Sequence, residues 1–119
     1  MRVLIADDHA IMRDGLRAIL LPACDLELIG EAVDGHDLLD KANALGPDVV
    51  IMDVTMPKVD GPEAARRLRD RRIAARIIVL TMHADPRLVR AMFAAGADAY
   101  FLKTSSADEL LFEIGRAHV

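Results

Sequence analysis

The sequence contains few of the residues on which several classes of protein depend. It has a single cysteine, Cys24, among 119 residues, so no disulfide can form within the chain, and such usage is typical of the reducing cytoplasm. Cys24 has no partner motif and is interpreted as a small buried apolar residue. Aromatic residues make up only 3% of the chain, which argues against the stacking platforms that bind single-stranded nucleic acid.

Long apolar runs and an excess of basic charge are also missing. No stretch approaches the roughly 20 residues of a transmembrane helix, and the apolar start Met1–Ile5 reaches Asp7 and Asp8 too soon for a signal peptide. The net charge of −4 argues against bulk electrostatic attraction to DNA or to an anionic membrane. We therefore expect a cytoplasmic domain that by itself binds neither nucleic acid nor membrane.

Hydrophobic residues make up 53% of the chain, enough for one domain with a substantial core. They form short bulky runs, typical of strands buried on both faces of a sheet, which alternate with stripes at helical spacing. This alternation predicts a (βα)5 α/β fold with a parallel five-stranded sheet and right-handed crossovers. The strands are expected at residues 2–6, 26–32, 48–53, 76–80 and 99–102.

The apolar pattern also predicts the order of the strands. Residues 26–32 partly alternate and suit an edge strand, whereas the first, third and fourth strands are the most uniformly apolar and belong inside. This favours the doubly wound, flavodoxin-like order 2-1-3-4-5. Helix ends are predicted at Asp34, Gly46-Pro47, Asp85-Pro86 and the capping box Ser106–Glu109.

Polar residues stand where the strands end. Asp7 and Asp8 follow the first strand, Asp53 ends the third, Thr81 ends the fourth and Lys103 follows the fifth. In the order 2-1-3-4-5 these residues share one edge of the sheet, and two charges about 4 Å apart repel by on the order of 4 kcal/mol at an effective dielectric near 20. Lys103 and a hard cation such as Mg²⁺ would offset the repulsion among the three carboxylates.

These residue types together predict a Mg²⁺-dependent phosphorylation of an aspartate. Aspartate can act as a nucleophile toward phosphoryl groups, and Mg²⁺, a lysine and a hydroxyl orient and neutralise the phosphoryl oxygens. Taken singly, Asp8 could cap a helix, Thr81 could bond to backbone, and Lys103 could be a solvated cation. Their joint presence at one edge favours the site.

Other polar patterns are interpreted as structural. The basic run Arg66–Arg72 is interleaved with acidic residues, so a solvated helix face is favoured over nucleic-acid binding. No glycine-rich phosphate loop is present. Four histidines without zinc spacing are interpreted as ordinary polar residues. These are His9, His36, His83 and His118.

The chain resembles the receiver domain of two-component response regulators over essentially its whole length, 1–119. The resemblance rests on the acidic pair Asp7-Asp8, the strand ending at Asp53, the loop Met56–Gly61, and the segments Leu80-Thr81 and Tyr100–Lys103. Residues 80–85 further resemble the subfamily with a C-terminal helix-turn-helix DNA-binding output domain.

The resemblance implies the metal and phosphoryl chemistry of the site. Asp53 would accept a phosphoryl group from a phosphohistidine on a sensor histidine kinase. Asp8 and Asp53 would ligate Mg²⁺ directly, Asp7 mostly through water, and Thr55 through its backbone carbonyl. The chain would thus be a phosphoacceptor that catalyses its own phosphorylation and dephosphorylation, not an enzyme acting on other molecules.

The resemblance also implies a switch. Lys103 would pair with the phosphoryl group, Thr81 would donate its hydroxyl to it, and Tyr100 would be the switch aromatic. The fourth helix, fifth strand and fifth helix would form the surface that controls an output domain for transcription regulation. Whether phosphorylation produces a homodimer is left open. The sequence ends at Val119 and does not include the output domain. Both a stand-alone receiver and a truncated protein are therefore possible interpretations.

The residue after Lys103 departs from the pattern of many receivers. Many receivers have a cis proline after the lysine, but Thr104 follows Lys103 here, and a cis bond before a residue other than proline costs about 2.5–4 kcal/mol. The isomer of that bond is left open.

A phosphoester hydrolase that forms an aspartyl phosphate would need a second acid where Thr55 stands. A degenerate receiver that serves only as an interaction module would not need the complete site.

Overall fold

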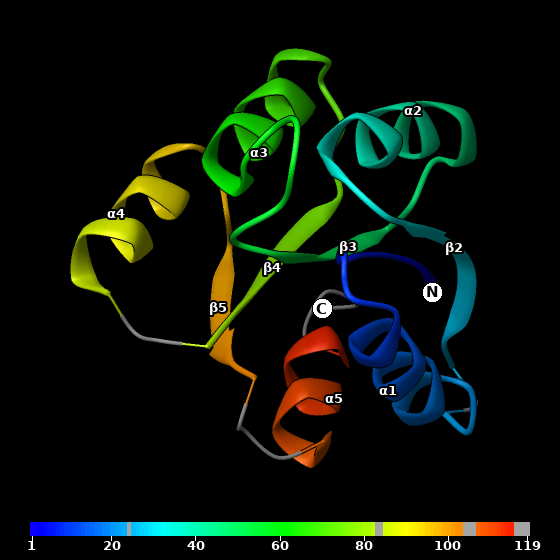
Figure 1. Ribbon diagram of the computed structural model, residues 1–119. Helices are drawn as coiled ribbons and strands as arrows, with labels where there is room; N and C mark the ends of the chain where they lie inside the picture. The colour runs from blue at the N-terminus through cyan, green and yellow to red at the C-terminus, as the bar shows by residue number, and fades with distance from the viewer. Residues whose placement is uncertain (24, 83–84, 104–106, 116–119) are drawn as a thin grey trace.

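The computed structural model describes residues 1–23, 25–82, 85–103 and 107–115, and within them five strands alternate with five helices (Figure 1). This confirms the predicted (βα)5 pattern. The strands are β1 (Arg2–Ala6), β2 (Glu27–Ala32), β3 (Val49–Asp53), β4 (Arg76–Thr81) and β5 (Ala99–Leu102). The helices are α1 (Ala10–Leu20), α2 (Gly35–Leu45), α3 (Gly61–Asp70), α4 (Pro86–Ala94) and α5 (Ala107–Gly115).

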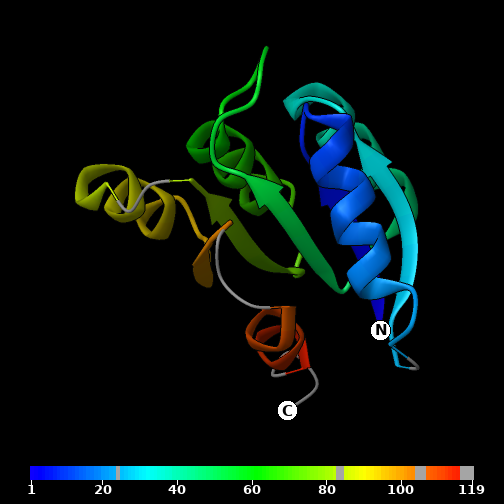
Figure 2. The same ribbon diagram turned by 60° about the horizontal axis from the view of Figure 1, so that its bottom comes forward.

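The five strands form one parallel sheet in the predicted order β2-β1-β3-β4-β5. The strands β1, β3 and β4 lie inside and are almost wholly buried, while β2 and β5 lie at the edges and are partly exposed. The helices α2, α3 and α4 cover one face of the sheet, and α1 and α5 cover the other (Figures 1 and 2). Both faces are therefore buried, which explains the continuous apolar runs.

The buried side chains of the inner strands alternate between two separate cores. In β4, Ile77 and Val79 pack in the core beneath α2, α3 and α4, whereas Ile78 and Leu80 pack in the core beneath α1 and α5. The same alternation holds in β1 and β3. Because successive side chains of a strand point to opposite faces, each inner strand contributes to both cores.

The predicted helix ends are confirmed where the structure describes them. The carboxylate of Asp34 accepts a hydrogen bond from the amide of Asp37, and Asp85 accepts one from Arg87. Gly46 ends α2 with a φ of 62°, the left-handed conformation that favours glycine. The expectations for Cys24, His83, His118, the capping serine Ser106 and the Lys103–Thr104 bond lie outside the described residues.

The prediction of a solvated basic face on α3 was wrong for one residue, Arg69. Its guanidinium donates hydrogen bonds to the carbonyls of Ile73, Ala75 and Gly96 and to the carboxylate of Asp98, at 2.7–3.1 Å. Arg69 thereby joins α3 to the segments that lead into β4 and β5. None of the helices in the described ranges is long and apolar enough to cross a membrane.

Candidate functional site

The sheet places the predicted polar residues together because all five strands end at the same edge. Sheet hydrogen bonds continue past the strands: the Asp7 amide donates to Ala32 O at 3.1 Å and the Lys103 amide donates to Thr81 O at 2.8 Å. Asp53 is the last residue of β3 and pairs in register with Leu80. The main chain at Asp7, Asp53 and Lys103 is thus fixed by the sheet itself, and the side chains of all three point to one place.

Lys103 lies between two buried carboxylates at the base of the site. Its Nζ is 3.1 Å from Asp7 Oδ2 and 3.2 Å from Asp53 Oδ2, and the lysine side chain is only 6% exposed. The other oxygen of Asp53 accepts a hydrogen bond from the amide of Thr55 at 3.4 Å. The prediction that Lys103 offsets acidic charge is therefore consistent with its position, and the reading of Lys103 as a solvated cation was wrong.

Burial and like charge set the electrostatics of the site. Burial, and then the neighbouring carboxylate of Asp7, raise the pKa of Asp53 above its ordinary value, although Lys103 and the Thr55 amide act in the opposite direction. Burial acts to lower the pKa of Lys103, but the Asp7 hydrogen bond and the charge of Asp53 outweigh it, so the pKa of Lys103 is raised. Lys103 stays charged, and it does not fully offset the acids around it.

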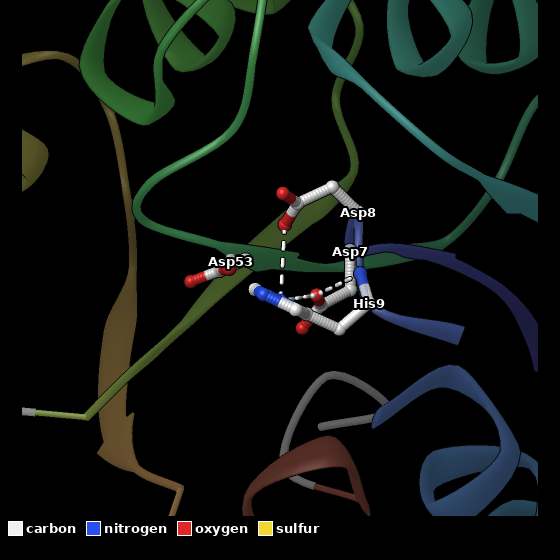
Figure 3. Close-up of side chains that lie close together, drawn as sticks. All are labelled: Asp7, Asp8, His9 and Asp53. Carbon is white, nitrogen blue, oxygen red and sulfur yellow. Dashed lines mark hydrogen bonds and ion pairs between the residues drawn. The ribbon is translucent and has the colours of Figure 1, made fainter. Parts of the chain in front are cut away.

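Asp8 and His9 lie beside Asp7 in the acidic site (Figure 3), and both side chains are more exposed than that of Asp7. The imidazole Nδ1 of His9 is 3.1 Å from Asp7 Oδ1 and 3.1 Å from Asp8 Oδ1. His9 thus lies among the carboxylates of the site, which the sequence analysis did not predict, and its place directly after the two aspartates was the available signal. His9, not Asp8, is the residue that precedes the first turn of α1, and its side chain makes no capping hydrogen bond.

A cleft of about 360 Å³ opens above these groups, and its lining includes the predicted residues Thr55 and Thr81. Thr81 is buried at the end of β4, and Thr55 is exposed in the loop after β3. The cleft is lined by Asp8, His9, Asp53, Val54, Thr55, Thr81, Met82, Asp85, Leu88 and Lys103.

Tyr100 lies away from the acids, on the edge strand β5. Its side chain is 41% exposed, and its ring meets Phe93 of α4 edge to face, with centroids 6.1 Å apart and an interplanar angle of 82°. Tyr100 and Thr81 both line a narrow apolar cavity with Leu88 and Met92 of α4. The structure therefore joins the end of β4 to α4 and β5 by direct packing.

The donor set fits a hard divalent cation. Oxygens of Asp7, Asp8 and Asp53 and a nitrogen of His9 lie within 4.8 Å of one another. Carboxylate oxygens are the ligands that Mg²⁺ prefers, with waters completing its shell. A cation here would offset the charge that Lys103 alone leaves unbalanced.

Comparison with known proteins identifies the family. The family model described as response regulator receiver domain matches residues 3–114. The chain belongs to the response regulator receiver domain family. The receiver is 44% identical over 110 residues to the transcriptional regulatory protein LiaR of Bacillus subtilis (strain 168), a match that covers 92% of the chain and 52% of LiaR. It is 35% identical over 111 residues to the transcriptional regulatory protein DegU of Brevibacillus brevis, a match that covers 93% of the chain and 47% of DegU.

Solved structures of receivers share the fold over nearly the whole chain. The signal receiver domain of the putative response regulator NarL from Mycobacterium tuberculosis superposes with a TM-score of 0.94 at 30% identity, covering 98% of this receiver and 95% of that chain. The isolated receiver domain of RcsB from Salmonella enterica serovar Typhimurium was solved with the phosphomimetic BeF3−. It superposes with a TM-score of 0.88 at 29% identity, and the match covers 97% of this receiver and 86% of that chain. The chain spans about half the length of the curated relatives named above.

Proposed function

We propose that this receiver accepts a phosphoryl group on Asp53 from a phosphohistidine of a sensor histidine kinase, with Mg²⁺ bound beside it. The observation that carries the proposal is the position of the Lys103 ammonium, 3.1 Å from Asp7 and 3.2 Å from Asp53 at the base of an acidic cleft. A lysine held between a metal-binding acid and the acceptor can neutralise a phosphoryl oxygen on the acceptor.

Asp8 and Asp53 would hold the metal directly, Asp7 through water and Thr55 through its main-chain carbonyl. When bound, Mg²⁺ would neutralise charge on the phosphoryl group and orient it toward Asp53. The raised pKa of Asp53 is consistent with a carboxylate whose charge a bound cation would help Lys103 to offset. The same groups would position water for the later hydrolysis of the aspartyl phosphate.

Thr81 and Tyr100 would convert phosphorylation into a change of surface. Phosphoryl oxygens on Asp53 would draw the Thr81 hydroxyl toward the site, because hydrogen bonds to charged groups are the stronger ones. Space would open in the cavity that Thr81 shares with Tyr100 and α4, and the ring of Tyr100 would turn inward. The surface formed by α4, β5 and α5 would then change by a shift in a pre-existing equilibrium.

The parent protein is proposed to be a cytoplasmic transcription regulator with a C-terminal DNA-binding output domain. The support is similarity to LiaR and DegU, both named transcriptional regulatory proteins, and the fact that the receiver spans about half of each. This fragment itself would not bind DNA, given its net charge of −4. Phosphorylation would also control any homodimer that forms.

The acceptor assignment is tested by phosphorylation of the 119-residue chain with Mg²⁺ and a small acyl phosphate, followed by intact-protein mass spectrometry. One adduct is expected in the wild type and none in Asp53→Asn. An adduct that persists in Asp53→Asn would refute the assignment. Continuous turnover of the acyl phosphate, without a lasting adduct, would favour the hydrolase, and no reaction at all would favour a degenerate interaction module.

The switch is tested separately by NMR with and without beryllofluoride, a phosphoryl mimic. We expect chemical-shift changes in α4 and at Tyr100 in the wild type. Thr81→Ala should still be phosphorylated at Asp53 but should lose these distant changes. Shifts confined to the cleft in the wild type would leave phosphorylation intact and contradict this switch.

A further inference from the structure

We infer that Arg13 of α1 is a positioning residue for the acidic site, because it fixes the main chain of the segment 7–9 that carries two of the three carboxylates. The inference rests on the proposed function in that the segment is taken to hold a metal ion. Arg13 itself does not line the acidic cleft. Its role would be to hold Asp7 and Asp8 in place before the metal arrives.

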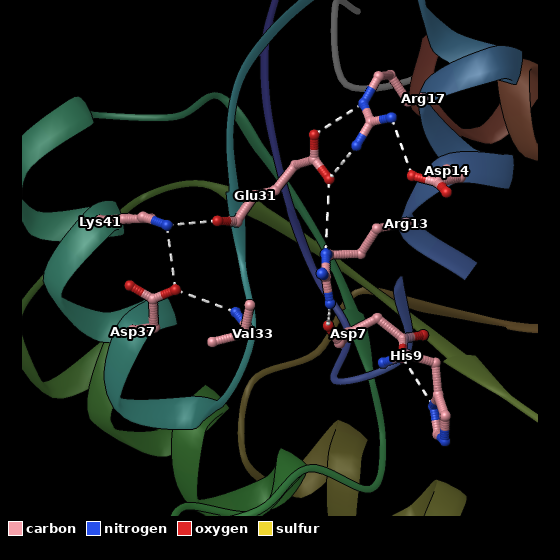
Figure 4. A network of polar contacts seen from close by, with 9 residues as sticks. All are labelled: Asp7, His9, Arg13, Asp14, Arg17, Glu31, Val33, Asp37 and Lys41. Atoms are coloured by element: carbon pink, nitrogen blue, oxygen red, sulfur yellow. Dashed lines mark hydrogen bonds and ion pairs between the residues drawn. The ribbon is translucent and has the colours of Figure 1, made fainter. Parts of the chain in front are cut away.

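The contact that carries the inference is between a guanidinium and a main-chain carbonyl. Arg13 Nη1 donates a hydrogen bond of 2.7 Å to Asp7 O (Figure 4), and the arginine side chain is only 17% exposed. The last sheet hydrogen bond of this segment is the one from the Asp7 amide to Ala32 O, so the sheet holds the amide side of Asp7. Arg13 holds the carbonyl side, and it thereby fixes the peptide plane that joins Asp7 to Asp8.

Arg13 is itself held by Glu31 of β2. Its Nε is 3.6 Å from Glu31 Oε1, and Glu31 is in turn fixed by two hydrogen bonds from Arg17, at 2.8 and 2.9 Å. The main-chain carbonyl of Glu31 accepts a hydrogen bond from Lys41 of α2. Figure 4 shows these contacts as one network that runs from α2 through β2 to the acidic segment.

The charge of Arg13 and its positioning role predict opposite effects on Mg²⁺ binding. A cation beside the site repels a metal ion, so removing Arg13 should strengthen Mg²⁺ binding if charge were its main influence. If Arg13 positions the segment, its removal should weaken Mg²⁺ binding, because partners that orient metal ligands typically contribute about 10–100-fold to metal affinity. The sign of the change therefore separates the two roles.

Arg17 provides a matched control. It lies one turn further along α1, carries the same charge and makes more hydrogen bonds to Glu31 than Arg13 does, but its described contacts are with Glu31 and Asp14 and do not include the acidic segment. Arg17→Gln removes a cation and its ion pairs with Asp14 and Glu31, and it leaves the contact between Arg13 and the Asp7 carbonyl in place. A merely structural role for Arg13 predicts that both variants behave alike.

The experiment is a Mg²⁺ titration of the 119-residue chain, followed by amide chemical shifts, on the wild type, Arg13→Gln and Arg17→Gln. We expect the Mg²⁺ dissociation constant to rise about tenfold in Arg13→Gln and to stay within about twofold in Arg17→Gln. Thermal midpoints measured on the same samples should fall in both variants. Equal Mg²⁺ affinities for Arg13→Gln and the wild type, or equal losses in the two variants, would overturn the inference.

A second readout needs no metal. The His9 amide donates to Asp7 Oδ1 at 2.9 Å, so hydrogen exchange at His9 reports on the order of the acidic segment. Exchange should be about tenfold faster in Arg13→Gln, the equivalent of one lost hydrogen bond to a charged donor, and unchanged in Arg17→Gln. If Arg13→Gln does not fold, Glu31→Gln, which leaves Arg13 in place without its orienting carboxylate, should show the same direction of change; unchanged exchange in that variant would refute the inference.

These two readouts separate the inference from the proposed function. A wild-type chain that shows no Mg²⁺-dependent shifts at the acidic site would refute the metal site, whereas the exchange comparison would still decide the role of Arg13. Mg²⁺ binding in the wild type together with unchanged exchange and affinity in Arg13→Gln would refute only the role of Arg13.

Discussion

The two ends of the sheet use their charged side chains in opposite ways. At the amino ends of the strands, the charges are matched by fixed partners: Arg2 donates to Leu45 O, Arg69 donates to three carbonyls and to Asp98, and Arg76 pairs with Glu113 of α5. At the carboxyl ends, three aspartates share one lysine and one histidine. At the amino ends each of these cations has a fixed acceptor in the chain, whereas at the carboxyl ends the acids outnumber the cations beside them.

This difference separates structural charge from functional charge. Guanidinium groups that saturate carbonyls stabilise the loops they join and leave nothing for a ligand to satisfy. Carboxylates that outnumber their cations make the folded state less stable than it could be, and that deficit is what a bound cation would relieve. The location of an unbalanced charge is therefore a better guide to the site than the number of charges.

The largest effect is expected from Arg69→Ala at the amino ends. This change leaves several main-chain carbonyls without their donor, and we expect the free energy of unfolding to fall by about 3 kcal/mol, measured by urea denaturation. Mg²⁺ affinity should be unchanged. Arg66→Ala is the matched control on the same helix, because Arg66 is exposed and pairs only with Glu63 among its described contacts; it should change stability by less than about 1 kcal/mol. A weaker Mg²⁺ affinity in Arg69→Ala would contradict the separation of the two ends.

Asp8→Ala at the carboxyl ends should weaken Mg²⁺ binding without lowering the stability of the metal-free protein. Loss of a direct ligand should weaken Mg²⁺ binding by at least about tenfold, measured by titration calorimetry. The metal-free thermal midpoint should rise by about 2 °C, because one source of repulsion is removed. A metal-free midpoint that falls as it does in Arg69→Ala would show that the acids are structural after all.

The smallest effect is a pH dependence at Asp53. Its pKa is raised in the folded state, so the folded protein binds this proton more tightly than the unfolded chain does. Stability associated with the protonated acid is complete below the unfolded pKa of about 3.9 and is lost as pH rises through the folded pKa. Asp53→Asn should therefore be more stable than the metal-free wild type at pH 7, and the difference should vanish in acid. Thermal midpoints compared across pH would test this, and a stabilisation that persists at the lowest pH would disprove the assigned cause.

The sequence predicted most of the fold because burial on both faces leaves a plain apolar signal in β1, β3 and β4. It predicted the clustering of Asp7, Asp53, Thr81 and Lys103 for the same reason, since parallel strands bring their carboxyl ends to one edge. The residue roles and the metal stay predictions. What the sequence did not reveal are contacts from side chains to distant carbonyls. Arg13 and Arg69 are ordinary helix residues in the sequence, and their partners depend on where loops of other elements pass.

The alternation of β4 between the two cores determines which helices pack beside Thr81. Val79 and Thr81 are two residues apart, and both line the cavity against α4, while Leu80 between them packs in the core beneath α1 and α5. The face of the sheet to which residue 81 points thus decides which layer of helices contacts the hydroxyl beside the acceptor site. A hydroxyl one residue earlier in β4, at position 80, would face the layer of α1 and α5 instead. The chemistry at Asp53 would be the same, but a different surface of the receiver would respond to it.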